Sequence, residues 1–162
     1  MTEPKWLVEA RAHIGEREIP GPAENPWIVR LWQAIKRGGI KTESVPWCAA
    51  FVGAMLEAVG IKSSRFESAA SYEKWGVELK SPALGCIVVF SRSGGGHVGF
   101  VVGRDLAGRL MVLGGNQGDA VSIAPFDRSR VVAYRWPAFT RLPDVLPLPF
   151  VASAAPSSSN EA

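Results

Sequence analysis

The chain has 162 residues, of which 47% are hydrophobic and 20% are charged. This is the length of one domain, and the hydrophobic fraction excludes a wholly disordered chain. Eighteen lysine and arginine residues against 15 aspartate and glutamate residues give a formal net charge of +3, and no basic cluster indicates a nucleic-acid surface. No apolar run reaches the roughly 18 residues of a membrane span. The opening MTEPKWLVEARAHIG lacks the pattern of a Sec-type signal peptide. We therefore expect synthesis in the cytoplasm, no nucleic-acid partner, no membrane span and a monomer.

The first 60 residues are predicted to be mainly helical, because apolar residues recur at a helical spacing between proline and glycine residues. A proline precedes the first helix and a glycine follows it, which suits a helix start and a helix end. A further short helix is expected before the composition of the sequence changes to short runs rich in β-branched residues. The expected helices cover about residues 4–14, 26–36, 46–59 and 69–75.

Beyond residue 85 the sequence consists of short runs rich in β-branched residues, separated by glycine and aspartate turns. Such runs predict about five strands of a mostly antiparallel sheet. The expected strands cover residues 86–90, 97–102, 109–113, 120–126 and 131–136. Because the helices precede the strands rather than alternating with them, we expect an α+β fold. Prolines and a Ser/Ala-rich end predict a loosely ordered tail over residues 143–162, and thus one domain over residues 1–142.

Cys48 is the candidate nucleophile. It directly follows Trp47 in VPWCAAFVGAMLEAVG, within the first turn of a predicted helix. Unpaired N–H groups and the helix dipole at this place favour a thiolate, the nucleophilic form of cysteine, and can also stabilise an oxyanion. The alternative is a buried cysteine that packs as a small hydrophobic residue. Cys86, at the head of a β-branched run, fits this second role better than that of a second nucleophile.

His97 and Asn116 are candidates for the groups that act with this thiol. His97 opens the predicted strand HVGFVVG, where glycines on the same face are expected to leave open space around the ring. If residues 105–108 form a hairpin loop, Arg104 pairs with Arg109 and His97 lies opposite Asn116, which could then orient the imidazole. The alternatives are a histidine that only ends a strand and an asparagine that permits a left-handed turn.

Other classes of site have little support in the sequence. The two cysteines and two histidines show no CxxC, HExxH or HxxxH spacing, and no GxGxxG or GxxxxGK[ST] phosphate loop occurs. A glycosidase needs two carboxylates that face a cleft, and nothing in the spacing of the N-terminal glutamates fixes such a pair. We therefore expect no metal ion and no organic cofactor.

Four segments in a fixed order resemble one family. The segments WCAAFV, GCIVVF, GHVGFVVG and VLGGNQGD together resemble the NlpC/P60 and CHAP group of papain-like cysteine peptidases, closest to compact endolysin-like members with a GGNQ motif. The resemblance covers about residues 5–137. It implies a papain-like fold in which the nucleophile lies at a helix N-terminus packed on the sheet, and a catalytic domain over residues 1–142.

The resemblance also implies roles for individual residues. Cys48 corresponds to the nucleophile, His97 to the general base and Asn116 to the polar third member. One departure is Cys86, since family members usually carry an aspartate at that place. The residues expected to contact substrate are Trp47, Glu18 and Gln117. For Trp47 the alternative is a core residue, because tryptophan lies more often in a core than in a cleft. For Glu18, in the segment GEREIPG, the alternative is an ordinary loop carboxylate.

The function that the resemblance implies is hydrolysis of an amide in bacterial peptidoglycan, at the muramoyl–L-alanine link or within the stem peptide. A phage-type endolysin or a delivered effector would be made in the cytoplasm and reach the cell wall in the periplasm after release by a phage or a secretion system. Two alternatives stay open, namely a transamidase or deamidase that acts on a protein, and a non-catalytic wall-binding module. A non-catalytic member is expected to lack one of the three site residues, and all three are present here.

Overall fold

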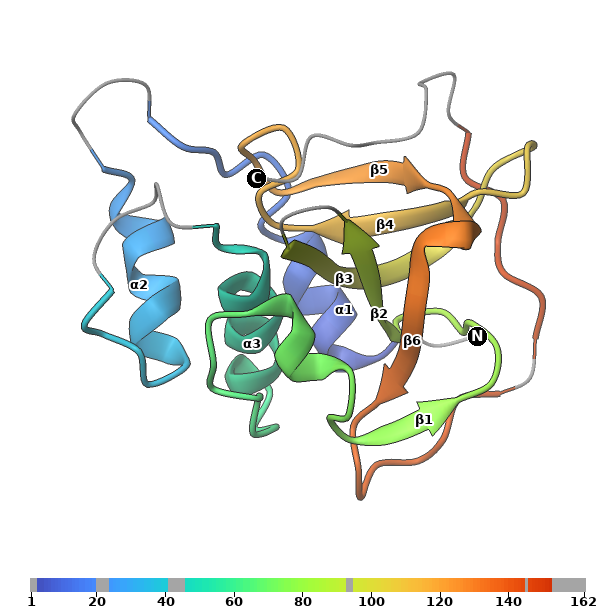
Figure 1. Ribbon diagram of the computed structural model, residues 1–162, viewed down its shortest axis with the longest axis horizontal. Helices are drawn as coiled ribbons and strands as arrows, with labels where there is room; N and C mark the ends of the chain where they lie inside the picture. Colours follow the sequence, from blue (N-terminus) through green and yellow to red (C-terminus); the bar gives the residue numbers. More distant parts are fainter. Residues whose placement is uncertain (1–2, 20–23, 41–45, 93–94, 145, 153–162) are drawn as a thin grey trace.

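The computed structural model describes residues 3–19, 24–40, 46–92, 95–144 and 146–152. Within these residues, three α-helices lie beside a six-stranded sheet (Figure 1). The helices come first in the chain and the strands follow, so the predicted α+β class is confirmed.

The helices begin at residues that suit a helix start. They are α1 (Lys5–Arg11), α2 (Pro26–Ala34), α3 (Cys48–Ala58) and the 3-10 helix η1 (Ala69–Tyr72). In α2, the Asn25 side chain accepts a hydrogen bond from the backbone N–H of Trp27, and Pro26 occupies the first turn. Helix α1 ends at Arg11, one turn earlier than expected, and the chain then turns through Gly15, which has a φ of 104°.

Helix α3 is buried between the other helices and the sheet. Every residue from Cys48 to Leu56 is buried, because the helix is apolar around its whole circumference and must be covered on every side. It packs against α1, α2 and β3, and it lies between α2 and the sheet (Figure 1). The first residue of α3 is therefore held by packing on several sides.

The sheet has the order β1-β6-β2-β3-β4-β5, and all neighbouring strands are antiparallel. The strands are β1 (Val77–Leu79), β2 (Ile87–Arg92), β3 (Gly95–Arg104), β4 (Leu110–Gly114), β5 (Ser122–Phe126) and β6 (Val131–Trp136), with the 3-10 helix η2 (Arg128–Arg130) before β6. Five of these strands match the predicted ones. The sixth, β1, was not predicted because three residues at the sheet edge, two of them exposed, show no alternating pattern.

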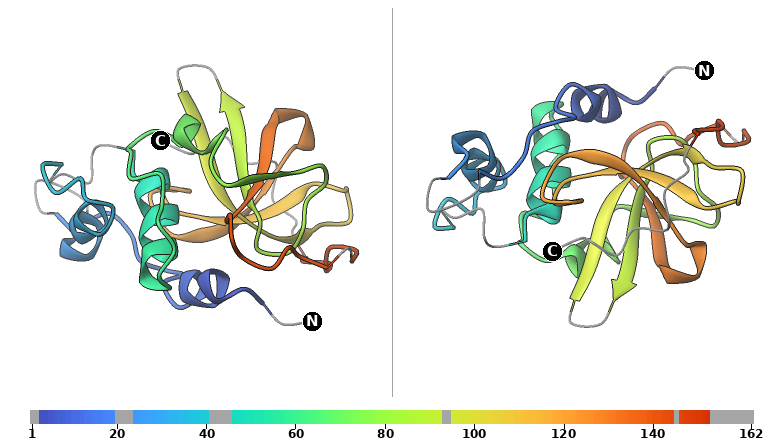
Figure 2. Two further views of the ribbon diagram at one scale, coloured as in Figure 1. Left: turned by 90° about the horizontal axis from the view of Figure 1, so that it is seen from below. Right: turned by 90° about the horizontal axis from the view of Figure 1, so that it is seen from above.

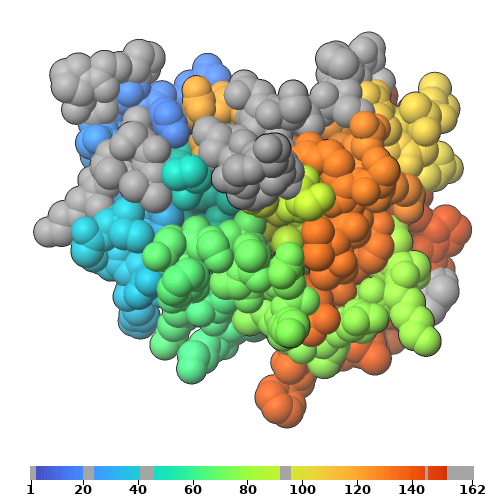
Figure 3. All heavy atoms as spheres, in the orientation of Figure 1, coloured from blue at the N-terminus to red at the C-terminus, as the bar shows by residue number. Residues whose placement is uncertain are grey.

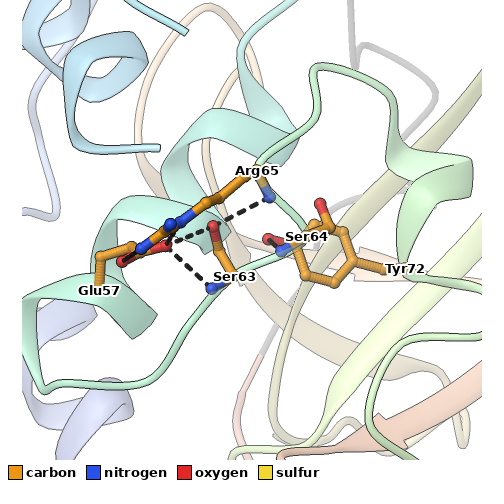
Figure 4. Close-up of polar contacts among 5 residues, drawn as sticks. All are labelled: Glu57, Ser63, Ser64, Arg65 and Tyr72. Atoms are coloured by element: carbon orange, nitrogen blue, oxygen red, sulfur yellow. Dashed lines mark hydrogen bonds and ion pairs between the residues drawn. The ribbon is translucent and has the colours of Figure 1, made fainter. Parts of the chain in front are cut away.

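The segment of residues 61–76 covers one face of the molecule between α2 and β6 (Figure 3). It is tied to the end of α3 by Glu57, whose carboxylate accepts hydrogen bonds from the backbone N–H of Ser63 at 3.0 Å and from Nε of Arg65 at 2.9 Å (Figure 4). The Arg65 guanidinium and the Ser63 donors lower the pKa of Glu57 from 4.5 to about 2. The same segment contains η1, which contacts β3 near its start.

The chain after β6 returns to the sheet. The backbone N–H of Arg104 donates to the carbonyl of Pro149 at 2.9 Å, and the N–H of Val151 donates to the carbonyl of Arg104 at 2.8 Å. Leu148 is buried in the core. Residues 148–151 are thus docked on the end of β3, in contrast to the loosely ordered tail expected over 143–162, whereas 153–162 lie outside the described residues.

Candidate active site

Cys48 is the first residue of α3, and only 3% of its surface is exposed. Trp47 precedes the helix with a non-helical backbone (φ −115°, ψ 17°), and its carbonyl accepts the first helical hydrogen bond from Phe51 at 2.9 Å. The first backbone N–H groups of a helix have no acceptor within the helix, and together with the helix dipole they favour a negative charge at this end. The position suits a reactive thiolate and a neighbouring oxyanion.

The ring of His97 is fully buried in β3. It stacks on the ring of Phe126 with centroids 5.2 Å apart and planes 10° apart, and the Phe90 ring packs against both, 4.7 Å from Phe126 and 6.3 Å from His97. This stack fixes the plane of the imidazole. The expectation of open space around the ring is wrong, since a Cβ at Gly99 would lie 3.1 Å from the carbonyl of Leu113, so that glycine instead permits β4 to approach.

Gln117 holds His97 within that plane. Nε2 of His97 lies 2.9 Å from Oε1 of Gln117. The amide nitrogen of Gln117 donates to the backbone carbonyls of Ser122 at 2.8 Å and Val112 at 3.2 Å. Because carbonyl oxygens only accept hydrogen bonds, the amide must turn its oxygen towards the ring, and Nε2 of His97 must carry the proton. The neutral ring therefore presents Nδ1 as its basic atom.

The predicted register between β3 and β4 is correct near His97, although the hairpin loop that joins the strands differs from the expected one. Arg104 pairs with Leu110, one residue beyond the expected Arg109, and an irregularity between Val101 and Gly103 compensates for the difference. Phe100 then pairs with Leu113, as predicted. Strand β4 ends at Gly114, so no ladder pair forms between His97 and the turn that follows.

Asn116 lies in that turn, next to Gln117. It is fully buried and has a left-handed backbone with φ of 60°, which agrees with the alternative role considered for it. The hydrogen bond to the His97 ring that was expected from Asn116 is made by Gln117. The sequence argument missed this because a side chain two residues beyond the end of a strand no longer follows the alternation of the strand.

The turn between β4 and β5 approaches both α3 and His97 because it begins with two glycines. A Cβ at Gly114 would collide with Oε1 of Gln117 and lie 3.3 Å from Nε2 of His97. A Cβ at Gly115 would lie 2.7 Å from the Trp47 ring and 2.7 Å from Cβ of Phe51. Figure 2 shows this turn beside α3 in both views. The turn thus joins the start of the cysteine helix to the residues that surround the histidine.

The two remaining residues expected to contact substrate, Trp47 and Glu18, contact each other. Nε1 of the Trp47 indole donates to Oε1 of Glu18 at 2.8 Å. Trp47 is fully buried and Gln117 is 3% exposed, and the contacts described for both are internal; a contact of either residue with substrate stays a prediction. A hollow of about 300 Å³ opens beside Glu18 and is lined by Arg17, Glu18, Ile19, Gly118 and Asp119.

The chain was compared with known proteins. Residues 40–116 match the model of the CHAP domain family. This match and the α+β architecture agree with the predicted papain-like, CHAP-like fold. The matched range includes Cys48 and His97 and ends at Asn116, one residue before Gln117. The search of curated proteins gave no match. CHAP domains are typically cysteine- and histidine-dependent amidases or peptidases, and the family match indicates peptidoglycan as the type of substrate.

The second cysteine of the chain, Cys86, has a different environment. Cys86 is fully buried and burial raises the pKa of its thiol to about 12. Cys48 and Cys86 are not joined in a disulfide. A thiol that stays protonated at neutral pH is a poor nucleophile, so Cys86 serves as a small core residue, as the sequence favoured.

Neither a metal cluster nor a membrane-spanning helix is found in the part of the chain that the structure describes. In those residues no three His, Cys, Asp or Glu side chains gather as ligands for a metal ion. No described helix has the length and apolar character needed to cross a bilayer.

Proposed function

We propose that this chain is a peptidoglycan hydrolase in which Cys48 cleaves an amide bond by acyl transfer and His97 moves the protons. The observation that carries the proposal is the turn at Gly114 and Gly115, which packs on the residues flanking Cys48 and also lies against His97. A cysteine at a helix start and a histidine with an oriented ring are the two groups that thiol acyl transfer requires.

The mechanism starts from Nδ1 of His97, the ring nitrogen that is not bonded to Gln117 and that carries no proton. Since Nε2 of His97 donates to Gln117, Nδ1 takes the proton of the Cys48 thiol. The thiolate attacks the amide carbonyl, and backbone N–H groups at the start of α3 stabilise the oxyanion. Protonated His97 gives its proton to the leaving amine, and the neutral ring then activates a water molecule that hydrolyses the thioester.

The third member of the site is assigned to Gln117 in this proposal. The expected residue in this role was Asn116, and the hydrogen bond between Oε1 of Gln117 and Nε2 of His97 supports the neighbouring glutamine instead. Its amide is itself fixed by Ser122 and Val112, so the orientation of the imidazole is supported by the sheet. Asn116 then serves the left-handed turn that brings Gln117 under the ring.

We further propose an endolysin-like setting, in which the protein is made in the cytoplasm and acts on the wall after release by a phage or a secretion system. The formal charge of +3 favours approach to a polyanionic cell wall. No metal ion or organic cofactor takes part in the proposed steps, because the thiol, the imidazole and a water molecule supply all the groups needed.

Digestion of purified Gram-negative peptidoglycan, followed by mass spectrometry of the soluble products, tests the proposal. Release of whole stem peptides identifies an amidase, and split stems identify an endopeptidase. An added amine, such as glycine methyl ester, distinguishes a transamidase because that ester would appear in the products. Peptidoglycan that binds the protein and stays intact contradicts the proposal and favours a wall-binding module.

A further inference from the structure

The Trp47 side chain is anchored at two points, Glu18 and Gly115. Its indole N–H donates to Oε1 of Glu18 at 2.8 Å, and its ring packs on Gly115 so closely that a Cβ there would lie 2.7 Å away. Trp47 is fully buried and directly precedes Cys48 at the start of α3. The contacts of the indole therefore help to fix the residue that precedes the nucleophile.

Glu18 is placed by a short ladder that also places Gln117. The backbone N–H of Glu18 donates to the carbonyl of Asp119 at 2.9 Å, and Arg17 forms an antiparallel bridge with Ala120. The carbonyl of Ala120 accepts a hydrogen bond from the backbone N–H of Gln117 at 2.9 Å. Two hydrogen-bonded segments thus present a carboxylate to the cysteine helix and an amide to the histidine ring.

We infer that Glu18 is a positioning residue which, through the Trp47 indole, sets the start of α3 and hence the Cys48 thiol relative to His97. This inference rests on the proposed use of Cys48 as the nucleophile. The role requires a hydrogen-bond acceptor at Glu18 and no negative charge, because a buried indole N–H needs only an acceptor. It replaces the expected role of Glu18 as a residue that contacts the substrate.

The test compares Glu18→Ala, which removes the acceptor, with Glu18→Gln, which keeps an acceptor and removes the charge. The first measurement is the rate at which iodoacetamide alkylates Cys48 in the whole protein, and it needs no peptidoglycan. Cys86 has no exposed surface and a raised pKa, so native labelling reports Cys48, with Cys48→Ala as the blank. The second measurement is kcat and KM for a soluble muropeptide.

We expect Glu18→Ala to lower both the alkylation rate and kcat about tenfold, with KM within about twofold, since small displacements of a reacting group are costly. Glu18→Gln should stay within about twofold of the wild type in all three quantities. Trp47→Phe should resemble Glu18→Ala, and the double variant should be no slower than either single variant, because both changes break one link.

Three results would overturn the inference. Alkylation of Glu18→Ala at the wild-type rate would show that Glu18 does not position Cys48. Loss of activity in Glu18→Gln equal to that in Glu18→Ala, or a rise in KM alone, would indicate a charged contact with substrate. Additive losses in the double variant would separate Glu18 from Trp47. If the alkylation rates follow the expected pattern and peptidoglycan stays intact, the positioning role stands and the proposed function fails.

Discussion

The His97 ring and the Gln117 side chain are joined by a hydrogen bond of 2.9 Å from Nε2 to Oε1, and the glutamine amide is fixed by two backbone carbonyls behind it. This arrangement selects one tautomer of the histidine and leaves Nδ1 as the base. In the proposed mechanism, the reactivity of the site therefore depends on Gln117, one position beyond the asparagine indicated by the sequence motif.

Removal of the Gln117 amide should lower kcat more than removal of the Asn116 side chain. We expect Gln117→Ala to reduce kcat about 10- to 100-fold with little change in KM, because the ring loses its orientation and its fixed tautomer. The matched control is Asn116→Gly, since glycine adopts the left-handed backbone of that position without strain. Steady-state kinetics on a soluble muropeptide measure both; a larger loss of kcat in Asn116→Gly would return the orienting role to Asn116.

A methyl group at Gly115 should destabilise the protein, because it would lie 2.7 Å from both the Trp47 ring and Cβ of Phe51. We expect Gly115→Ala to lower the free energy of unfolding by about 1–3 kcal/mol, the usual cost of overpacking. Gly39→Ala is the control, since a Cβ at Gly39 meets no atom within 4 Å. Urea denaturation compares the two variants. Equal stability of both would contradict the close packing between α3 and the β4–β5 turn.

Acid should loosen the attachment of residues 61–76 through Glu57. The pKa of Glu57 is lowered from 4.5 to about 2 in the folded protein. The ionised carboxylate thus stabilises the fold above pH 4.5, and this stabilisation is lost as the pH falls from about 4.5 towards 2. We expect about 1 kcal/mol, given the partly solvated position of the Arg65 pair.

The unfolding free energy of the wild type and of Glu57→Gln, measured by urea denaturation from pH 6 to pH 3, isolates this contribution. The difference between the two proteins should shrink as the pH falls. A difference that is independent of pH would show that the Glu57 charge does not hold the segment.

The docked segment of residues 148–151 should contribute to stability without being essential to the site. A protein ending at residue 142 should fold and stay active, with a free energy of unfolding lower by about 1–3 kcal/mol, because it loses the buried Leu148 side chain and the two backbone hydrogen bonds to Arg104. A protein ending at residue 152 keeps these contacts and serves as the control. Identical thermal stability of the two truncated proteins would show that the docking contributes nothing.

Much of the fold could be predicted from the pattern of apolar residues: α2 shows a helical period, α3 is an apolar run that ends before Gly60, and five strands are β-branched runs between turns. The missed strand β1 is short and partly exposed, so its pairing with β6 is a tertiary effect that leaves little pattern in the sequence. The register of β3 and β4 was predicted near the site although the hairpin loop was misplaced by one residue, because the irregularity after Val101 cancels the error.

The candidate site was harder to predict than the fold. Cys48 and His97 could be singled out, because a cysteine at a helix start and a histidine after glycines are local signals. The contacts of Gln117 and Glu18 depend on turns whose side-chain directions follow no period, so their partners His97 and Trp47 appear only in the folded structure. The two glycines at 114 and 115 carry a signal, since adjacent glycines after a strand indicate a close approach of backbone to side chains.

The most direct test of the central claim compares the same substitution at the two cysteines. Purified Gram-negative peptidoglycan is incubated with the wild type, Cys48→Ala and Cys86→Ala, and newly formed peptide ends are quantified by mass spectrometry. We predict new ends with the wild type and with Cys86→Ala, and none above background with Cys48→Ala, because only Cys48 lies at the start of α3 beside the His97 site. Formation of new ends by a folded Cys48→Ala protein at the wild-type rate would contradict the account.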